Sequence, residues 1–65
     1  MSKKEKIERE RKRIEREIPF WESRADFVRS LLAANITHTN TYENERWLQN
    51  ILLRIEQLRE ELKNL

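Results

Sequence analysis

The sequence predicts an all-α fold: an antiparallel helical hairpin with a coiled-coil-like seam that dimerises into a four-helix bundle. Charged residues make up 40% of the 65-residue chain, proline occurs once, and glycine is absent, whereas about 7% glycine is usual. Apolar residues recur at helical spacing through most of the chain. Because cysteine is also absent, neither disulfides nor a cysteine-bound zinc ion can stabilise so short a chain, and association with a second copy is the remaining means.

The chain begins with a charged arm, residues 1–13, which we expect to be either an exposed helix or a frayed segment. Residues 1–17 carry eight basic and five acidic side chains, so the basic excess of the chain lies here. Pairs such as Glu5 with Arg9 have the spacing of helical ion pairs, each worth about 0.2–0.5 kcal/mol. Such pairs favour a helix but bury no apolar surface.

The helical hairpin follows over residues 14–65, and its first helix is predicted over about 14–34. Apolar residues occupy the a and d positions of a heptad pattern there and form one half of the predicted core. These residues are Ile14, Ile18, Trp21, Ala25, Val28 and Leu32. Asn35 can adopt the left-handed conformation that commonly ends a helix, so a loop is predicted over about 35–41.

The second helix is predicted over about 41–64 and carries the clearest pattern in the sequence. Asn40 followed by Glu43 matches a helix N-cap with an acidic residue at the third helical position. The seam residues of this helix are separated by three or four positions, as in a coiled coil. They are Leu48, Ile51, Ile55, Leu58 and Leu62, and they form the other half of the predicted core.

The two seams match when the helices are folded antiparallel with residue 34 opposite residue 42. Each seam residue of the second helix then meets a seam residue of the first, which an arbitrary offset would not achieve. The resulting pairs are Ile14 with Leu62, Ile18 with Leu58, Trp21 with Ile55, Ala25 with Ile51, and Val28 with Leu48. This match indicates a hairpin with a defined register.

Pro19 interrupts the pattern of the first helix, and two interpretations compete. A proline inside a helix costs about 3 kcal/mol and bends the helix, but a kinked and continuous helix keeps Ile14 and Ile18 in the seam. Alternatively, Pro19 is the first residue of a new helix, a position that proline favours. Ser23 and Asp26 could even form a capping box that starts the helix later. We favour the kink because Ile14 and Ile18 otherwise lose their partners.

The apolar side chains outside the seam exceed what two helices can bury between them. They are Phe20, Phe27, Leu31, Tyr42, Trp47, Leu52 and Leu53. Large exposed apolar surface marks an association site. We therefore expect these residues to form either the core of a dimer or a contact surface for a protein partner. Leu53 lies opposite the seam and is either an ordinary exposed leucine or a contact for that partner.

The residue types that catalysis requires are missing. The only histidine is His38 in a polar segment, and the carboxylates alternate with basic residues, so we expect no enzymatic activity, metal, cofactor or small-molecule substrate. The absence of glycine excludes the glycine-rich loops that bind phosphates. No apolar run approaches the length of about 20 residues that spans a membrane. The charged N-terminus lacks the apolar segment of a signal peptide, so we expect an intracellular, cytoplasmic protein.

Two functions remain. The first is protein–protein interaction: a homodimer that binds and modulates one protein partner, in the manner of small inhibitors and adaptors, a class that includes proteins of phages and mobile elements. The alternative is a nucleic-acid-binding regulator that uses the basic arm of a helical dimer. Its candidate phosphate contacts are Lys3, Lys4, Lys6, Arg9, Lys12, Arg13 and Arg16. Interleaved glutamates and the lack of aromatic residues in the arm make this the second choice.

Overall fold

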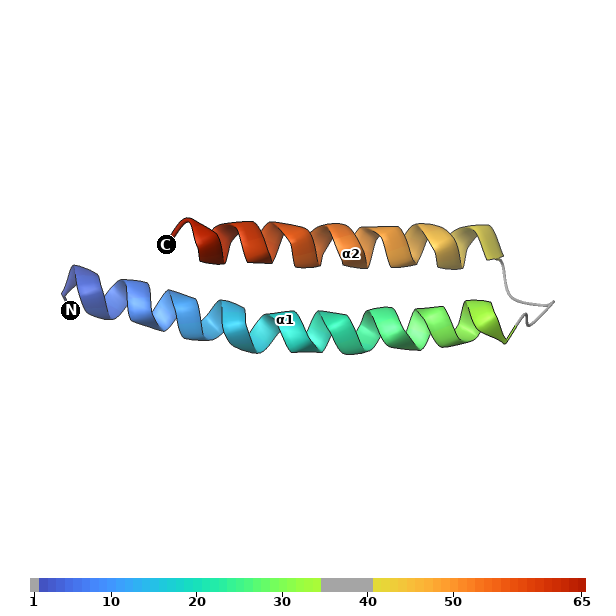
Figure 1. The fold of residues 1–65 in the computed structure, drawn as a ribbon, viewed down its shortest axis with the longest axis horizontal. Helices are drawn as coiled ribbons and strands as arrows, with labels where there is room; N and C mark the ends of the chain where they lie inside the picture. Colours follow the sequence, from blue (N-terminus) through green and yellow to red (C-terminus); the bar gives the residue numbers. More distant parts are fainter. Residues whose placement is uncertain (1, 35–40) are drawn as a thin grey trace.

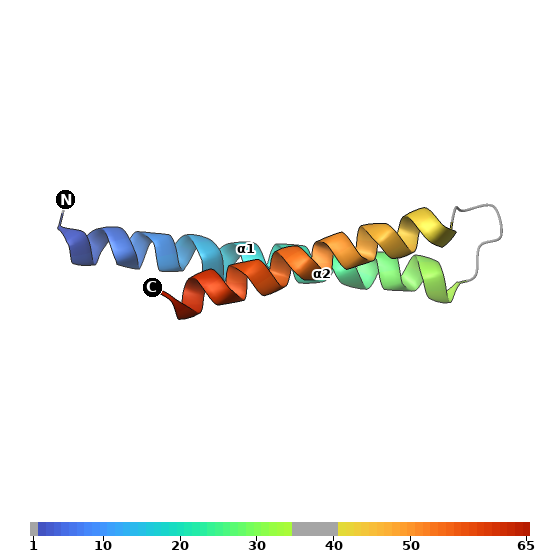
Figure 2. The ribbon, with the colours of Figure 1, turned by 90° about the horizontal axis from the view of Figure 1, so that it is seen from above.

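The computed structural model describes residues 2–34 and 41–65, which form two α-helices and no strand. Helix α1 spans Lys3–Ala33 and helix α2 spans Thr41–Lys63. The helices lie side by side and antiparallel (Figure 1). Seen from above, they cross at a shallow angle (Figure 2), as helices do when their side chains interlock along a seam. The predicted all-α fold of two packed helices is confirmed.

Helix α1 begins at Lys3 because Ser2 caps it. The backbone of Ser2 is extended, with φ −73° and ψ 158°, and its hydroxyl accepts a hydrogen bond of 3.2 Å from the backbone N–H of Glu5. The Ser2 carbonyl accepts the first helical hydrogen bond, 3.1 Å long, from the N–H of Lys6. A serine with glutamate three residues later has the spacing of a capping box. The charged arm therefore forms the first turns of α1, and the helix starts well before residue 14.

Helix α1 passes through Pro19 without interruption. Proline has no N–H to donate, so the carbonyl of Glu15 loses its usual helical partner. Pro19 is exposed, which lets water reach that part of the backbone. The trace of α1 bends only gently (Figure 1). Helix starts at Pro19 or after Ser23 are excluded, and Ile14 and Ile18 remain on the same helix as the rest of the seam.

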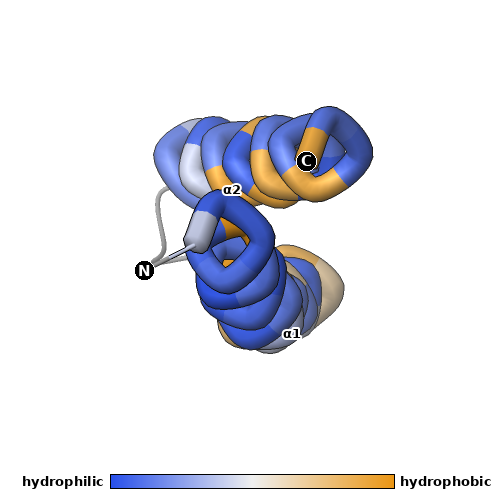
Figure 3. Tube along the Cα trace, turned by 90° about the vertical axis from the view of Figure 1, so that its left-hand side faces the viewer, coloured by the Kyte–Doolittle hydropathy of each residue, from blue (hydrophilic) through white to orange (hydrophobic). Residues whose placement is uncertain are grey.

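The seam between α1 and α2 is the core. Among the described residues the buried side chains are all apolar: Ile14, Ala25, Val28, Ile51, Ile55 and Leu58. The remaining predicted seam residues are half-buried: Ile18, Trp21, Leu32, Leu48 and Leu62. Ala25 and Val28 of α1 cluster with Ile51 and Ile55 of α2, so these turns lie opposite one another as in the predicted register. Figure 3 shows the hydrophobic residues mainly on the facing sides of the two helices.

The two helices differ in length, and this leaves one end of α1 uncovered. Helix α1 has 31 residues and α2 has 23, and the N-terminal turns of α1 extend past the C-terminal end of α2 (Figure 1). The predicted caps Asn35 and Asn40 lie outside the described residues. So does the predicted loop, except for Thr41, which is the first residue of α2.

The seam assignment predicts opposite outcomes for two neighbouring substitutions in α2. Ile55 is 6% exposed and Leu53 is 53% exposed. Ile55→Asp places an unpaired charge in the seam and should cost more than the about 2–5 kcal/mol of truncating a buried isoleucine. Leu53→Asp should change stability by only about 0.5 kcal/mol. Thermal unfolding followed by circular dichroism measures both, and equal losses would mean that the faces of α2 are wrongly assigned.

Candidate interaction surface

A pair of packed helices has two flanks, one on each side of the seam. On α1, Glu22, Asp26 and Arg29 are separated by four and three residues, so they share one face of the helix. On α2, Leu52 and Arg59 are seven residues apart and likewise share a face. The Arg59 guanidinium donates a hydrogen bond of 3.0 Å to the Glu22 carboxylate, so these two faces lie on the same side of the hairpin. We call this side the charged flank.

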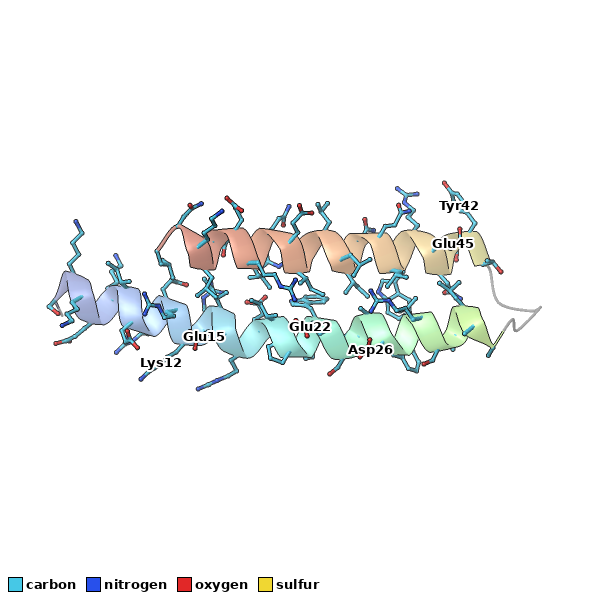
Figure 4. All side chains as sticks on the ribbon, viewed as in Figure 1. Lys12, Glu15, Glu22, Asp26, Tyr42 and Glu45 are labelled. Carbon is cyan, nitrogen blue, oxygen red and sulfur yellow. The ribbon has the colours of Figure 1, made fainter. Side chains whose placement is uncertain are left out.

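The charged flank is already satisfied by its own ion pairs. Besides the Glu22–Arg59 pair, Arg29 pairs with Asp26 at 3.2 Å. Figure 4 shows Glu22 and Asp26 along one side of α1. All four side chains are exposed, so each pair adds at most about 1 kcal/mol. Leu52 is the one exposed large hydrophobic residue among the described members of this flank, which makes the flank a solvated surface.

The opposite flank carries large apolar side chains that the core covers only in part. On α1, Glu17, Trp21 and Leu31 share a face, and on α2, Trp47 and Arg54 share a face. Arg54 donates a hydrogen bond of 3.2 Å to Glu17, which places both faces on the same side of the hairpin. We call this side the tryptophan flank. Trp21 and Leu31 are half-buried and Trp47 is 38% exposed, so the ring and leucine surfaces adjoin the core but are not covered by it.

Two phenylalanines extend the apolar surface from the tryptophan flank toward the outer side of α1. Phe20 is 51% exposed and Phe27 is 58% exposed. The Phe20 ring meets Trp21 edge to face, with the centroids 5.3 Å apart and the planes at 77°. The Arg24 guanidinium lies 5.0 Å from the Phe20 centroid in a cation–π contact. These contacts hold the ring of Phe20 in place while much of it remains exposed.

Glu17 is the centre of the polar contacts on the tryptophan flank. Its carboxylate accepts hydrogen bonds from the indole N–H of Trp21 at 3.2 Å, from Arg54 at 3.2 Å and from Arg13 at 2.9 Å. Arg13 also pairs with Glu10 on its own helix and with Glu61 of α2 at 3.9 Å. The carboxylate thus fixes the tilt of the Trp21 indole relative to the seam. It also ties α1 to α2 beside that ring.

These contacts shift the protonation of Glu17. The hydrogen bond from Trp21 lowers the pKa of the Glu17 carboxyl, and the hydrogen bond and charge of Arg54 and the charge of Arg13 lower it further, while partial desolvation acts in the opposite direction. The hydrogen bond to Glu10 raises the pKa of the Arg13 guanidinium. Both side chains therefore stay charged over the neutral pH range.

Sequence reasoning did not identify Glu17 or Arg54 as functional residues. A signal was present, because Glu17 directly precedes the seam residue Ile18, and positions beside a coiled-coil seam commonly form ion pairs between helices. The helical spacing between Glu17 and Trp21 was a second signal.

The sequence grouped seven apolar residues as one surface, and the structure divides them. Phe20, Phe27, Leu31 and Trp47 lie on or beside the tryptophan flank, whereas Leu52 lies on the charged flank. By helical spacing, Tyr42 and Leu53 lie on the outer side of α2. Tyr42 points away from α1 (Figure 4). The first group therefore shares one side of the hairpin, and the other residues do not.

The basic residues of the arm are divided in the same way. Arg13 belongs to the contacts around Glu17. The others take part in no ion pair within the described part of the chain: Lys3, Lys4, Lys6, Arg9, Lys12 and Arg16. Of these, Arg9, Lys12 and Arg16 share the outer side of α1, because they are separated by three and four residues.

The described residues contain no group of three or more histidine, cysteine or acidic side chains arranged to hold a metal ion. Neither α1 nor α2 is long and apolar enough to cross a membrane. His38 lies outside the described residues. No family model, curated protein or solved structure matches the chain. The geometry of the two flanks is therefore the basis for assigning a function.

The lowered pKa of Glu17 predicts how acid affects stability. A carboxyl whose pKa is lower in the folded state stabilises the fold above its ordinary pKa, and this contribution is lost as pH falls through the folded pKa. Glu17→Gln removes that contribution. The melting temperature of the variant should therefore fall less between about pH 7 and about pH 3 than that of the parent chain.

Glu56→Gln is the matched control, because Glu56 is exposed and takes part in no described ion pair. It should retain the acid sensitivity of the parent chain. Thermal melts at both pH values measure the effect. The same acid sensitivity in Glu17→Gln as in the control would show that the Glu17 contacts do not stabilise the fold.

Proposed function

We propose that this chain is a non-enzymatic interaction protein that associates with itself and binds and modulates a protein partner, as an inhibitor or adaptor does. One observation carries the proposal: large apolar side chains gather on the tryptophan flank, next to the core, while the charged flank is satisfied by its own ion pairs. An uncovered apolar surface of this kind marks an association site. The uneven distribution of apolar side chains between the two flanks favours one specific contact surface over non-specific association.

The residue types on the tryptophan flank are those that dominate binding energy at protein interfaces. Tryptophan and arginine are enriched at such hot spots, and the flank presents Trp21 and Trp47 together with Arg24. Trp21 is already ordered by the core and by its hydrogen bond to Glu17. Side chains that are ordered before binding lose less entropy on association. The flank is thus prepared for contact.

A two-fold dimer is the simplest assembly that covers the flank. Two hairpins packed through this side form a four-helix bundle, and closed two-fold dimers are the commonest homo-oligomers. In that bundle Tyr42 and Leu53, on the outer side of α2, stay accessible for a further protein. They are 71% and 53% exposed in the single hairpin. We assign the partner contact to this outer side.

The self-association is tested with two residues of equal exposure on opposite flanks. Trp47 and Leu52 are each 38% exposed. Trp47→Asp should weaken dimerisation by a hot-spot loss of about 2–4 kcal/mol, or a roughly 30- to 1,000-fold higher Kd. Leu52→Asp should leave the Kd within about threefold, a change of under 1 kcal/mol. Sedimentation equilibrium over a concentration series measures both. A parent chain that is monomeric throughout would remove the self-association.

Nucleic-acid binding is the second candidate, favoured by the unpaired row of Arg9, Lys12 and Arg16 on the outer side of α1. Phosphate groups would neutralise such a row and release counterions. Base stacking has less support, because the Arg24 guanidinium already lies over the ring of Phe20. The row therefore suits the sugar–phosphate backbone and gives no means of reading a sequence.

This candidate predicts a salt-dependent loss of binding. Replacing Arg9, Lys12 and Arg16 by glutamine should weaken binding to RNA or DNA and lower the salt slope by about one for each phosphate that is no longer neutralised. Replacing Arg29, Arg46 and Lys63 by glutamine removes the same charge elsewhere and should have little effect. Filter binding at several salt concentrations measures both. Equal losses in the two variants would indicate attraction by net charge alone.

A further inference from the structure

We infer that the tryptophan flank is covered by the same flank of a second copy, with both hairpins pointing the same way, so that α1 of each copy packs against α2 of the other. This inference rests on the proposed self-association and adds its orientation. We call the end of the hairpin where Ala33 and Thr41 lie the turn end. In the inferred dimer the two turn ends lie together.

The order of side chains along the tryptophan flank is the first argument. Starting from the terminal end, α1 presents Arg13, then Glu17, then Leu31. At the same levels, α2 presents Glu61, then Arg54, then Trp47. The single hairpin shows that the first two levels match, because Arg13 pairs with Glu61 at 3.9 Å and Glu17 with Arg54 at 3.2 Å. In the predicted register, Leu31 and Trp47 lie within a turn of one another. At these three levels, therefore, the two helices are complementary.

If the two-fold axis runs parallel to the hairpin, the matches between α1 and α2 within one copy are repeated between the two copies. Such an axis exchanges the positions of α1 and α2 in the facing copy but leaves every level unchanged. Arg13 then faces Glu61 of the partner copy, Glu17 faces its Arg54, and Leu31 faces its Trp47. At these three levels, charges meet opposite charges and apolar side chains meet apolar side chains. Complementary potentials of this kind fix the orientation of an interface.

The reversed arrangement lacks this match. An axis perpendicular to the hairpin places α1 against α1 of the partner copy, running in the opposite direction. Arg13 and Glu17 would face the apolar turn end of the partner and lose water without gaining a charged partner, which is costly.

In the inferred orientation every neighbouring helix pair is antiparallel, as it also is in the reversed arrangement. Each α1 then contacts its own α2 and the α2 of the partner copy, both antiparallel to it, so the helix dipoles oppose one another. A further consequence concerns the N-terminal turns of α1 that extend past α2 (Figure 1). Both extensions leave the bundle at the same end, so their unpaired basic residues form one cationic site made by two copies.

Spin labels on single cysteines test the orientation, because the chain has no cysteine of its own. Lys4→Cys places a label on the extension of α1, and Glu45→Cys places one near the turn end, away from the tryptophan flank (Figure 4). If both copies point the same way, the two equivalent labels of the dimer should lie about 20–30 Å apart, a distance set by the width of a four-helix bundle. Pulsed dipolar spectroscopy measures this distance.

The reversed dimer gives a different result for Lys4→Cys. At a rise of about 1.5 Å per residue, the two labels would be on the order of 60 Å apart. That distance would overturn the inferred orientation while leaving the self-association intact. If the labelled chains and the unlabelled parent chain all sediment as monomers, the proposed self-association is overturned, and this inference is overturned with it. Dimerisation with a distance of about 20–30 Å at both positions supports the inference.

Discussion

Two helices can cover only one stripe of each other, and this constraint governs the molecule. The seam buries Ile14, Leu58 and their neighbours, yet a helix that widens its apolar stripe beyond the seam has nothing within the hairpin to cover the excess. In a larger protein a third helix would fill that place. Here the excess includes Trp47, which is 38% exposed although it directly precedes a seam residue. The surface that remains open is thus a consequence of packing only two helices against each other.

The ion pairs affect the placement of neighbouring side chains more than the stability of the hairpin. Those between α1 and α2 are partly exposed, so each adds at most about 1 kcal/mol, less than burying a single leucine. Their placement has a larger effect. On one flank Glu22 and Arg59 satisfy each other and leave a surface that water covers well. On the other, Glu17 accepts hydrogen bonds from Trp21, Arg13 and Arg54, which orders an aromatic ring at the edge of the core.

The sequence predicts the seam well because hydrophobic periodicity is local and repeats over several heptads. The sequence left the arm as either an exposed helix or a frayed segment for the opposite reason: the first turns carry almost no apolar residue, and the local signals are only the ion-pair spacings and Ser2 with Glu5. Glu17 was missed because its meaning depends on Arg54, 37 residues away. Predicting how the apolar surface is divided requires both the faces of each helix and the register between the helices. Trp47 and Leu52, for example, are near neighbours in sequence but lie on opposite flanks.

The contrast between the two flanks bears on how large an assembly the proposed contact can form. A hairpin with two apolar flanks would bind a copy on each side and polymerise. This hairpin has one apolar flank, and in a two-fold dimer that flank is used up by both copies at once. The sides of the bundle that lie opposite the contact are then the charged flanks, whose pairs are already made. Association through this flank would stop at the dimer, so the same uneven distribution that favours the proposed contact would also limit it.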